Sequence, residues 1–304
     1  MTSRFAAPTT IEAALAILSS DRDARPVAGG TDLVVASRQG RRGLPESIVA
    51  IDRIADLARH GVEDGGLVLG ALTSHDWIAS SAEVAASWSA LADASAIVGS
   101  PATRSTGTIG GNLMNASPAA ETVGPLVVLQ ANVILRAIGR GSRIVPAAAL
   151  AVGPGRTSAA ADELLTAVIV PRPAEGSGSA YVRLEYRRAM EIAVVGAAGL
   201  VTLDGDGRIA TARIALTSVA PTIIRAADAE AVLVGAAAEP ATFRAAAEAA
   251  SAAANPIDDV RASADYRRAM LVVVVARTLA AATARARGEL IPIPASRWAN
   301  GQEI

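Results

Sequence analysis

Strands and helices follow one another in two different orders along this chain, and this change of order limits the folds it can adopt. Up to about residue 170, strand-like runs such as Ser47–Asp52 and Leu67–Ala71 alternate with helical segments. Beyond that point three strand-like runs come without an intervening helix: Tyr181–Arg187, Ala193–Leu203 and Arg208–Val219. Strands followed by helices predict an antiparallel sheet covered by helices on one face. The sequence therefore predicts an α+β protein with two domains, which a chain of 304 residues can accommodate.

A stretch rich in proline and glycine, residues 171–178, is the best candidate for the boundary between the domains. We expect the first domain at residues 1–175, the second at residues 176–290, and a C-terminal tail at residues 291–304. Within the second domain, helices are expected over Ala226–Val234, Ala241–Ala253 and about 263–287.

Two residue types are missing from the sequence. It contains no cysteine and no lysine, so all 28 basic residues are arginine. Without cysteine there is no disulfide, no thiolate zinc site and no cysteine-ligated iron–sulfur cluster on this chain. Without lysine there is no Schiff base and no P-loop lysine. The two histidines, His60 and His75, are expected to be exposed, and we expect neither a catalytic residue set nor a metal site here.

Charge and hydropathy give no sign of nucleic acid or membrane as a partner. The 29 acidic residues balance the 28 basic ones, so no strong field attracts a polyanion. The first residues lack the apolar core of a signal peptide, and the longest apolar run, residues 269–276, is far below the roughly 20 residues of a membrane-spanning helix. We expect a cytoplasmic protein without a membrane span.

Two glycine-rich segments are candidates for a ligand site. Gly29 and Gly30 lie between a predicted strand and a helix that begins at Thr31, and Gly107–Asn112 lies in a long predicted loop, Gly99–Ala120. Successive backbone amides near the start of a helix bind phosphate without a basic side chain. Two such segments suit a pyrophosphate, and neither matches the G-x-G-x-x-G pattern typical of NAD-binding Rossmann domains.

These segments also carry a resemblance to a known family. Val27–Leu33 (VAGGTDL) and Gly107–Leu113 (GTIGGNL) resemble the FAD-binding medium subunits of molybdenum hydroxylases, the xanthine dehydrogenase and carbon monoxide dehydrogenase family. The similarity continues through nearly the whole chain, at Gly70–Thr73, Ala116–Glu121, Tyr181–Arg183, Val219–Thr222 and Asp265–Arg268.

The resemblance implies a two-part PCMH-type (vanillyl-alcohol-oxidase-like) FAD-binding domain, followed by a CO-dehydrogenase flavoprotein C-terminal domain with a three-stranded antiparallel sheet and helices. It implies that noncovalently bound FAD passes electrons from partner iron–sulfur clusters to an external acceptor. Molybdopterin would lie on a large partner subunit and the [2Fe-2S] clusters on a small one, in a dimer of heterotrimers.

The resemblance also implies the residues that contact FAD. Two groups would surround the pyrophosphate: Ala28, Gly29, Gly30, Thr31, Asp32 and Leu33, and Thr108, Ile109, Gly110, Gly111 and Asn112. Five further positions would lie near the ribose, the adenine or the flavin ring: Val98, Glu121, Leu165, Tyr181 and Arg183. Glu121 stands where the family has aspartate, and Arg183 stands where it has lysine, which changes the geometry of the hydrogen-bond donors.

Two other functions fit parts of the pattern. One is a self-sufficient FAD-dependent oxidase or reductase of the same superfamily, which would need an acid or base beside the flavin, and no convincing set of such residues is found. The other is a flavin-free assembly subunit, against which the two intact glycine segments argue.

Overall fold

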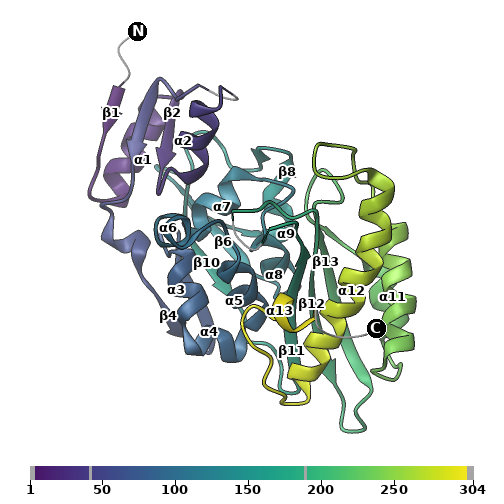
Figure 1. The fold of residues 1–304 in the computed structure, drawn as a ribbon. Coiled ribbons are helices and arrows are strands. Elements are labelled where there is room, and N and C mark those ends of the chain that lie inside the picture. Colours follow the sequence, from purple (N-terminus) through teal and green to yellow (C-terminus); the bar gives the residue numbers. More distant parts are fainter. Residues whose placement is uncertain (1–3, 41–42, 188–189, 300–304) are drawn as a thin grey trace.

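The computed structural model describes residues 4–40, 43–187 and 190–299 of the chain. Figure 1 shows three main sheets along the molecule: a small one at the N-terminal end, a central one, and a third whose outer face is covered by helices. The α+β architecture expected from the sequence is therefore confirmed.

The N-terminal sheet is parallel, with strand order β1-β3-β2. Its strands are β1 (Arg4–Ala6), β2 (Ala24–Val27) and β3 (Ser47–Ala50), and the helices between them are α1 (Ile11–Ser20) and α2 (Thr31–Arg38). Helix α1 forms because Thr10 caps it, accepting a hydrogen bond from the Ala13 amide, and because its apolar residues recur at helical spacing and are buried on one face.

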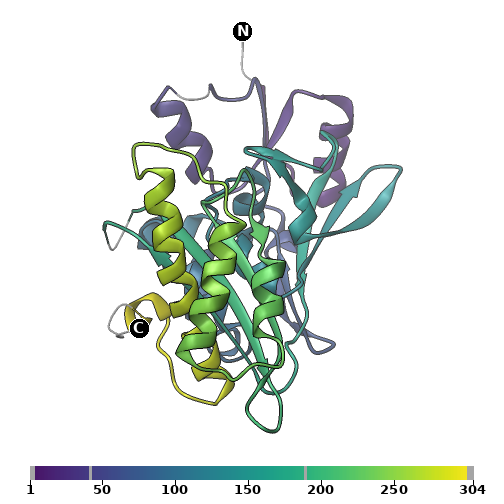
Figure 2. The same cartoon turned by 90° about the vertical axis from the view of Figure 1, so that its right-hand side faces the viewer.

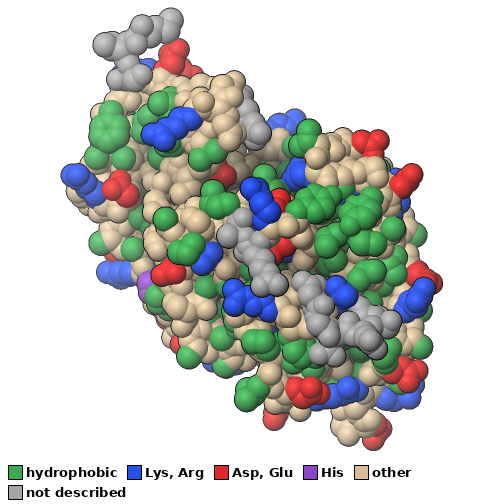
Figure 3. Space-filling view, viewed as in Figure 1, with side chains coloured by type: hydrophobic (Ala, Val, Ile, Leu, Met, Phe, Trp, Pro, Cys, Tyr) green, Lys and Arg blue, Asp and Glu red, His purple; other side chains and the backbone are tan. Residues whose placement is uncertain are grey.

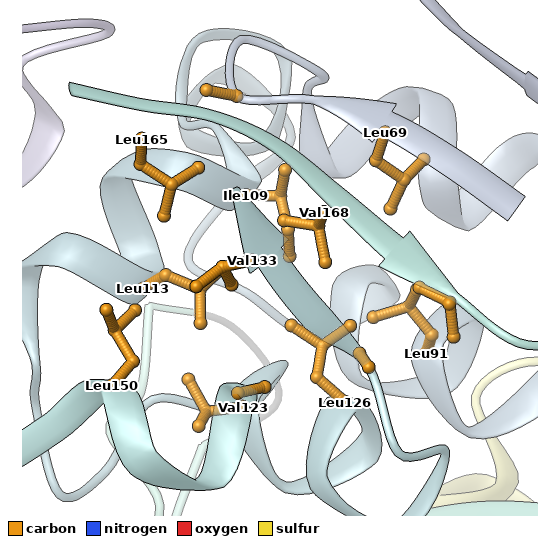
Figure 4. Packing of buried hydrophobic residues seen from close by; sticks show 14 of the residues in the cluster. Leu69, Leu91, Ile109, Leu113, Val123, Leu126, Val133, Leu150, Leu165 and Val168 are labelled. Carbon is orange, nitrogen blue, oxygen red and sulfur yellow. The ribbon is translucent and has the colours of Figure 1, made fainter. Parts of the chain in front are cut away.

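The central sheet is antiparallel and has the order β4-β5-β10-β6-β7. Its strands are β4 (His60–Glu63), β5 (Gly66–Gly70), β6 (Asn132–Ala137), β7 (Gly141–Pro146) and β10 (Leu164–Val170). The middle strand β10 places Leu165 and Val168 in the first hydrophobic core, where they pack with Leu69, Val133 and Leu126 (Figure 4).

Short elements complete the first half of the chain. They are η1 (Ala55–Ala58), α3 (His75–Ser80), α4 (Ala82–Ser87), α5 (Ser89–Ala96), α6 (Pro101–Thr106), α7 (Ile109–Asn115), α8 (Val123–Val128), α9 (Ala147–Leu150), β8 (Ala151–Gly153) and β9 (Arg156–Thr157).

The segment Gly99–Ala120, predicted to be a loop, instead contains the helices α6 and α7. Both helices are capped by hydroxyl side chains, because Ser100 accepts a hydrogen bond from the Thr103 amide and Thr108 accepts one from the Gly111 amide. The abundance of serine, threonine and glycine in this stretch therefore marks helix ends. Just before this segment, the helices α4 and α5 follow one another and are separated at Trp88.

The third sheet is antiparallel, with strands β11 (Ser177–Leu184), β12 (Val195–Leu203), β13 (Ile209–Thr217) and β14 (Ile224–Arg225) in that order. The strands β12 and β13 match the predicted runs within two residues, whereas β11 begins four residues before the start of the predicted run Tyr181–Arg187 and ends three residues before its end. The strand β14 is a fourth strand of two residues, too short to leave a sequence signal. The helices that follow are α10 (Ala227–Leu233), α11 (Pro240–Ala252), α12 (Ala264–Ala286) and α13 (Ala295–Ala299). Figure 2 shows the long helices side by side on one face of this sheet.

Both faces of the third sheet are buried, which explains its continuous apolar runs. Tyr181, Ala198 and Leu200 belong to the first core, whereas Ala180 and Val182 belong to a second core beneath the helices. This alternation follows from the two-residue period of a strand. The third sheet is thus a shared wall between the two halves of the protein.

Helix α12 is long and apolar enough to cross a membrane, with a mean hydropathy of 1.6, but it lies along β11 and β12. The contact is close, since a Cβ at Gly178 would lie 2.1 Å from the Ala282 carbonyl oxygen. Packing against the sheet therefore accounts for the apolar composition of α12. On the face shown in Figure 3, acidic and basic side chains are interspersed, and hydrophobic side chains gather over the first half of this helix.

The buried carboxylate of Asp93 joins the two halves. Asp93, on α5, is fully buried and accepts hydrogen bonds from the guanidinium of Arg285 on α12 at 2.6 and 2.9 Å. It also accepts from the backbone amides of Tyr181 at 3.0 Å and Ala295 at 2.8 Å. Burial raises the pKa of Asp93, and the cation and the two amides act in the opposite direction and offset part of the cost of burying the charge. Their arrangement fixes α5, β11, α12 and the start of α13 relative to one another.

This arrangement predicts a large effect of removing the carboxylate. In Asp93→Ala the guanidinium of Arg285 loses its carboxylate partner, and the amides of Tyr181 and Ala295 lose their acceptor. We therefore expect the free energy of unfolding to fall by about 3–5 kcal/mol. Urea unfolding followed by tryptophan fluorescence measures it. The control Glu248→Ala removes an exposed ion pair with Arg244 within α11 and should change the stability far less. Equal losses in the two variants would contradict the role of Asp93.

Candidate functional site

The two glycine segments, far apart in the sequence, lie against each other. A Cβ at Gly29 would be 1.9 Å from the Thr106 carbonyl oxygen, and one at Gly107 would be 3.5 Å from Thr31 Oγ1. No side chain fits at position 29, so glycine is required there for the two segments to approach. The structure thus brings the predicted residues of both segments into one site.

The first segment leaves the start of α2 open. Gly30 has φ +67°, a left-handed conformation that favours glycine, and it makes no side-chain cap. The first helical hydrogen bond runs from the Val34 amide to the Gly30 carbonyl at 2.9 Å. The amides of Thr31, Asp32 and Leu33 therefore have no carbonyl one turn earlier to which they could donate. Together with the positive end of the helix dipole, they form a suitable place for a phosphate group.

The second segment differs, because its amides already donate within the protein. Ile109 donates to the Thr73 carbonyl and Gly110 to the Ala71 carbonyl, both at 3.0 Å. The Gly111 amide donates to Thr108 Oγ1 at 3.1 Å, and the Asn112 amide donates to the Thr108 carbonyl at 3.0 Å. A second array of free amides, expected from the sequence, is therefore not formed by these residues. What this segment can offer a ligand is the half-buried Asn112 side chain.

Helix α7 is held tightly to the end of β5 through these bonds. A Cβ at Gly110 would lie 2.6 Å from the Ala71 carbonyl oxygen, so this glycine also serves chain packing. The side chain of Asn112 is fixed by a hydrogen bond from Thr122 Oγ1 to its Oδ1 at 2.7 Å.

Glu121 and Arg183, predicted separately, form a buried ion pair. Arg183 Nη1 donates to Glu121 Oε1 at 2.6 Å, and Arg183 Nε donates to Glu185 Oε2 at 2.6 Å. The Arg183 side chain is fully buried and also pairs with Glu185 through Nη2. Burial raises the pKa of Glu121, and the charge of Arg183 acts in the opposite direction. Most of the guanidinium donors are thus used inside the protein.

Three predicted flavin neighbours lie in different surroundings. Tyr181 is fully buried, with its hydroxyl facing Gly196, and burial raises the pKa of this phenol. Leu165 is in the first core (Figure 4). Val98 is half-buried beyond the end of α5, and its carbonyl accepts a hydrogen bond from Arg104 Nη1 at 3.3 Å. In this structure only Val98 of the three is partly open to solvent.

His75, expected to be exposed, is buried and lies against the second glycine segment. Its amide donates to the Gly107 carbonyl at 3.2 Å, and its ring lies 3.4 Å from the place of a Cβ on that glycine. Burial, followed by the nearby charge of Arg104, lowers the pKa of His75 to about 4. The ring is therefore neutral at pH 7. The helix cap Ser74 places His75 at the first position of α3 but does not indicate that the side chain is buried.

Comparison with known proteins assigns the chain to a family. Residues 1–173 match the family model described as the FAD binding domain in molybdopterin dehydrogenase. The chain belongs to that family. Residues 180–282 match the CO dehydrogenase flavoprotein C-terminal domain, so the resemblance and the two-domain architecture expected from the sequence are confirmed.

Relatives and solved structures agree. The chain is 36% identical to the 6-hydroxypseudooxynicotine dehydrogenase complex subunit alpha of Paenarthrobacter nicotinovorans, over 91% of this chain and 93% of the relative. It is 34% identical to the carbon monoxide dehydrogenase medium chain of Hydrogenophaga pseudoflava, over 92% of this chain and 97% of the relative. A structure of carbon monoxide dehydrogenase from that organism superposes with a TM-score of 0.88 at 34% identity, covering 94% of this chain and 98% of the other.

The contact between the two segments can be tested without a ligand. In Gly29→Ala the added carbon would overlap the Thr106 carbonyl, so we expect the free energy of unfolding to fall by about 1–3 kcal/mol. Gly61→Ala is the control, because nothing lies within 4 Å of a Cβ at that glycine. If urea unfolding gave the same midpoint for both variants, the close approach of the segments would be disproved.

The buried histidine predicts a loss of stability in acid. Because His75 has a pKa of about 4 in the folded protein and about 6.5 when unfolded, the unfolded chain binds a proton more readily between these values. The contribution of the neutral His75 ring to the free energy of unfolding is complete above pH 6.5. It should fall by about 2 kcal/mol between pH 7 and pH 5. In His75→Gln this part of the pH dependence of urea unfolding should disappear, whereas His60→Gln, at the exposed histidine, should retain it. An unchanged profile in His75→Gln would contradict the prediction.

Proposed function

We propose that this chain is the FAD-binding electron-transfer subunit of a multi-subunit molybdenum hydroxylase. The observation that carries the proposal is the pair of glycine segments packed together at the open start of α2, in a chain that matches the family through both domains. Such a site suits a dinucleotide with a pyrophosphate, because backbone amides at a helix start bind phosphate without a basic side chain.

FAD would be held noncovalently by the residues named above. The amides of Thr31, Asp32 and Leu33 would bind the pyrophosphate, with Ala28, Gly29 and Gly30 lying alongside. The segment Thr108–Asn112 would form the other wall, with the Asn112 side chain as its donor. These donors fit a phosphate, since the first helical hydrogen bond of α2 is made by the Val34 amide, and the three amides before it have no carbonyl one turn earlier. FAD itself supplies the transfer of single electrons and electron pairs.

The second domain contributes the charged network near the site. Arg183 neutralises part of the charge of Glu121 and Glu185, so the three side chains carry one net negative charge. Val98, which is partly open to solvent, would lie beside the flavin ring, and the buried Leu165 and Tyr181 would support its surroundings from inside the protein. In electron transfer these side chains would bind and orient the flavin ring and keep water away from it.

The names of the relatives and the absence of cysteine point to partner subunits. Relatives are named as a complex subunit and as medium chains. Cysteine ligates iron–sulfur clusters, and this sequence has none, so the [2Fe-2S] clusters would lie on a small subunit and molybdopterin on a large one. We expect a dimer of such heterotrimers in the cytoplasm. An external acceptor would take the electrons from FAD.

The domain boundaries belong to the same proposal, with residues 1–175 as the FAD domain, 176–290 as the second domain and 291–304 as the tail. The family models support it, since one match ends at residue 173 and the next begins at residue 180.

Purification tests the proposal directly. The full chain should be yellow, and heat or acid should release a flavin that comigrates with FAD. A tagged chain recovered from its native source should bring molybdenum- and iron-containing chains with it, whereas an untagged control should not. A colourless chain that takes up no FAD would overturn the proposal. So would turnover of an organic substrate at ordinary enzyme rates by the chain alone.

A further inference from the structure

Thr122 makes an unusual use of its hydroxyl group. It occupies the cap position of α8, where a threonine side chain ordinarily accepts a hydrogen bond from the first turn, yet it makes no such bond. Instead Thr122, which is fully buried, donates through Oγ1 to Asn112 Oδ1 at 2.7 Å. The hydroxyl is therefore committed to the second glycine segment.

The positions of both backbones are fixed by other bonds. The Asn112 amide donates to the Thr108 carbonyl at 3.0 Å, and the Thr122 carbonyl accepts from the Leu126 amide at 3.2 Å. The residue before Thr122 is Glu121, which is held by Arg183. The hydroxyl of Thr122 is thus left to control the orientation of the Asn112 side chain.

Orientation matters because the two ends of an asparagine amide group have similar shape and opposite hydrogen-bonding character. With Oδ1 occupied by the threonine hydroxyl, the NH2 group offers its donors. Rotation by half a turn would present the carbonyl oxygen instead. Phosphate oxygens accept hydrogen bonds and carry negative charge, so they bind the NH2 end and repel the carbonyl end.

We infer that Thr122 is a positioning residue that turns the NH2 group of Asn112 toward the FAD pyrophosphate. The inference rests on the proposed FAD site and adds to it a residue that does not itself contact FAD. Thr122 would act by selecting one of the two orientations of the Asn112 amide group.

Two substitutions separate the hydroxyl from the shape of the residue. Thr122→Val keeps the volume and removes the donor, and FAD should bind about tenfold more weakly, as expected for one lost hydrogen bond to a charged group. Thr122→Ser keeps the hydroxyl and should bind within about threefold of the wild type. The dissociation constant is measured by quenching of FAD fluorescence on titration into the flavin-free full chain.

A matched control is Thr166→Val, since Thr166 is also buried and its Oγ1 donates to the Ile134 carbonyl on the neighbouring strand β6. This variant should keep the wild-type affinity. The ³¹P resonances of bound FAD give a second readout, because they should shift in Thr122→Val and stay in place in Thr166→Val and Thr122→Ser.

The outcomes are distinguishable. If the wild type takes up FAD and Thr122→Val binds it equally well, with unchanged ³¹P resonances, the inference is wrong and the proposed function stands. If Thr122→Ser loses as much affinity as Thr122→Val, the hydroxyl is not the cause, and the inference is also wrong. If the wild-type chain takes up no FAD, both the function and the inference fall.

Discussion

The carboxylate of Asp93 is the constraint on which the rest of the structure depends. It lies in the interior on a short helix of the first half, and its donors come from β11, α12 and the start of α13. A buried charge is tolerated only with its partners in place, so the third sheet can settle in one position against the first half. That position brings Arg183 of β11 beside Glu121 and so completes the charged network next to the glycine segments.

Glycine serves two purposes at this site. Gly29 and Gly110 are needed because another stretch of backbone comes too close for any side chain. Gly30 is needed for a left-handed conformation that turns the chain into α2 and leaves amides uncovered. A glycine-rich pattern in a sequence therefore does not by itself say whether a ligand or the protein occupies the space beside it. Here the first segment faces outward with free donors, and the second is occupied mainly by its own chain.

Much of the fold was predictable because it depends on local patterns. The strands β11, β12 and β13 are long apolar runs, and the glycine segments have family-specific neighbours. Both kinds of feature can be recognised from consecutive residues of the sequence. The helices within 99–120 were missed because caps such as Ser100 and Thr108 belong to residue types that are also typical of loops. His75 and the pair Asp93–Arg285 were missed for another reason. Their burial depends on segments far away in the sequence, and no local spacing records which of them meet.

The internal hydrogen bonds of the second segment have a consequence for the timing of ligand binding. The amides of Ile109 and Gly110 donate to the carbonyls of residues 73 and 71, so this segment is ordered when the chain folds. The conformational entropy of ordering the segment is therefore lost on folding and not on ligand binding. Helix α2 on the opposite side has no buried side chain, and few contacts resist its displacement. The site thus pairs a segment that is held by its own hydrogen bonds with a helix whose side chains are not buried.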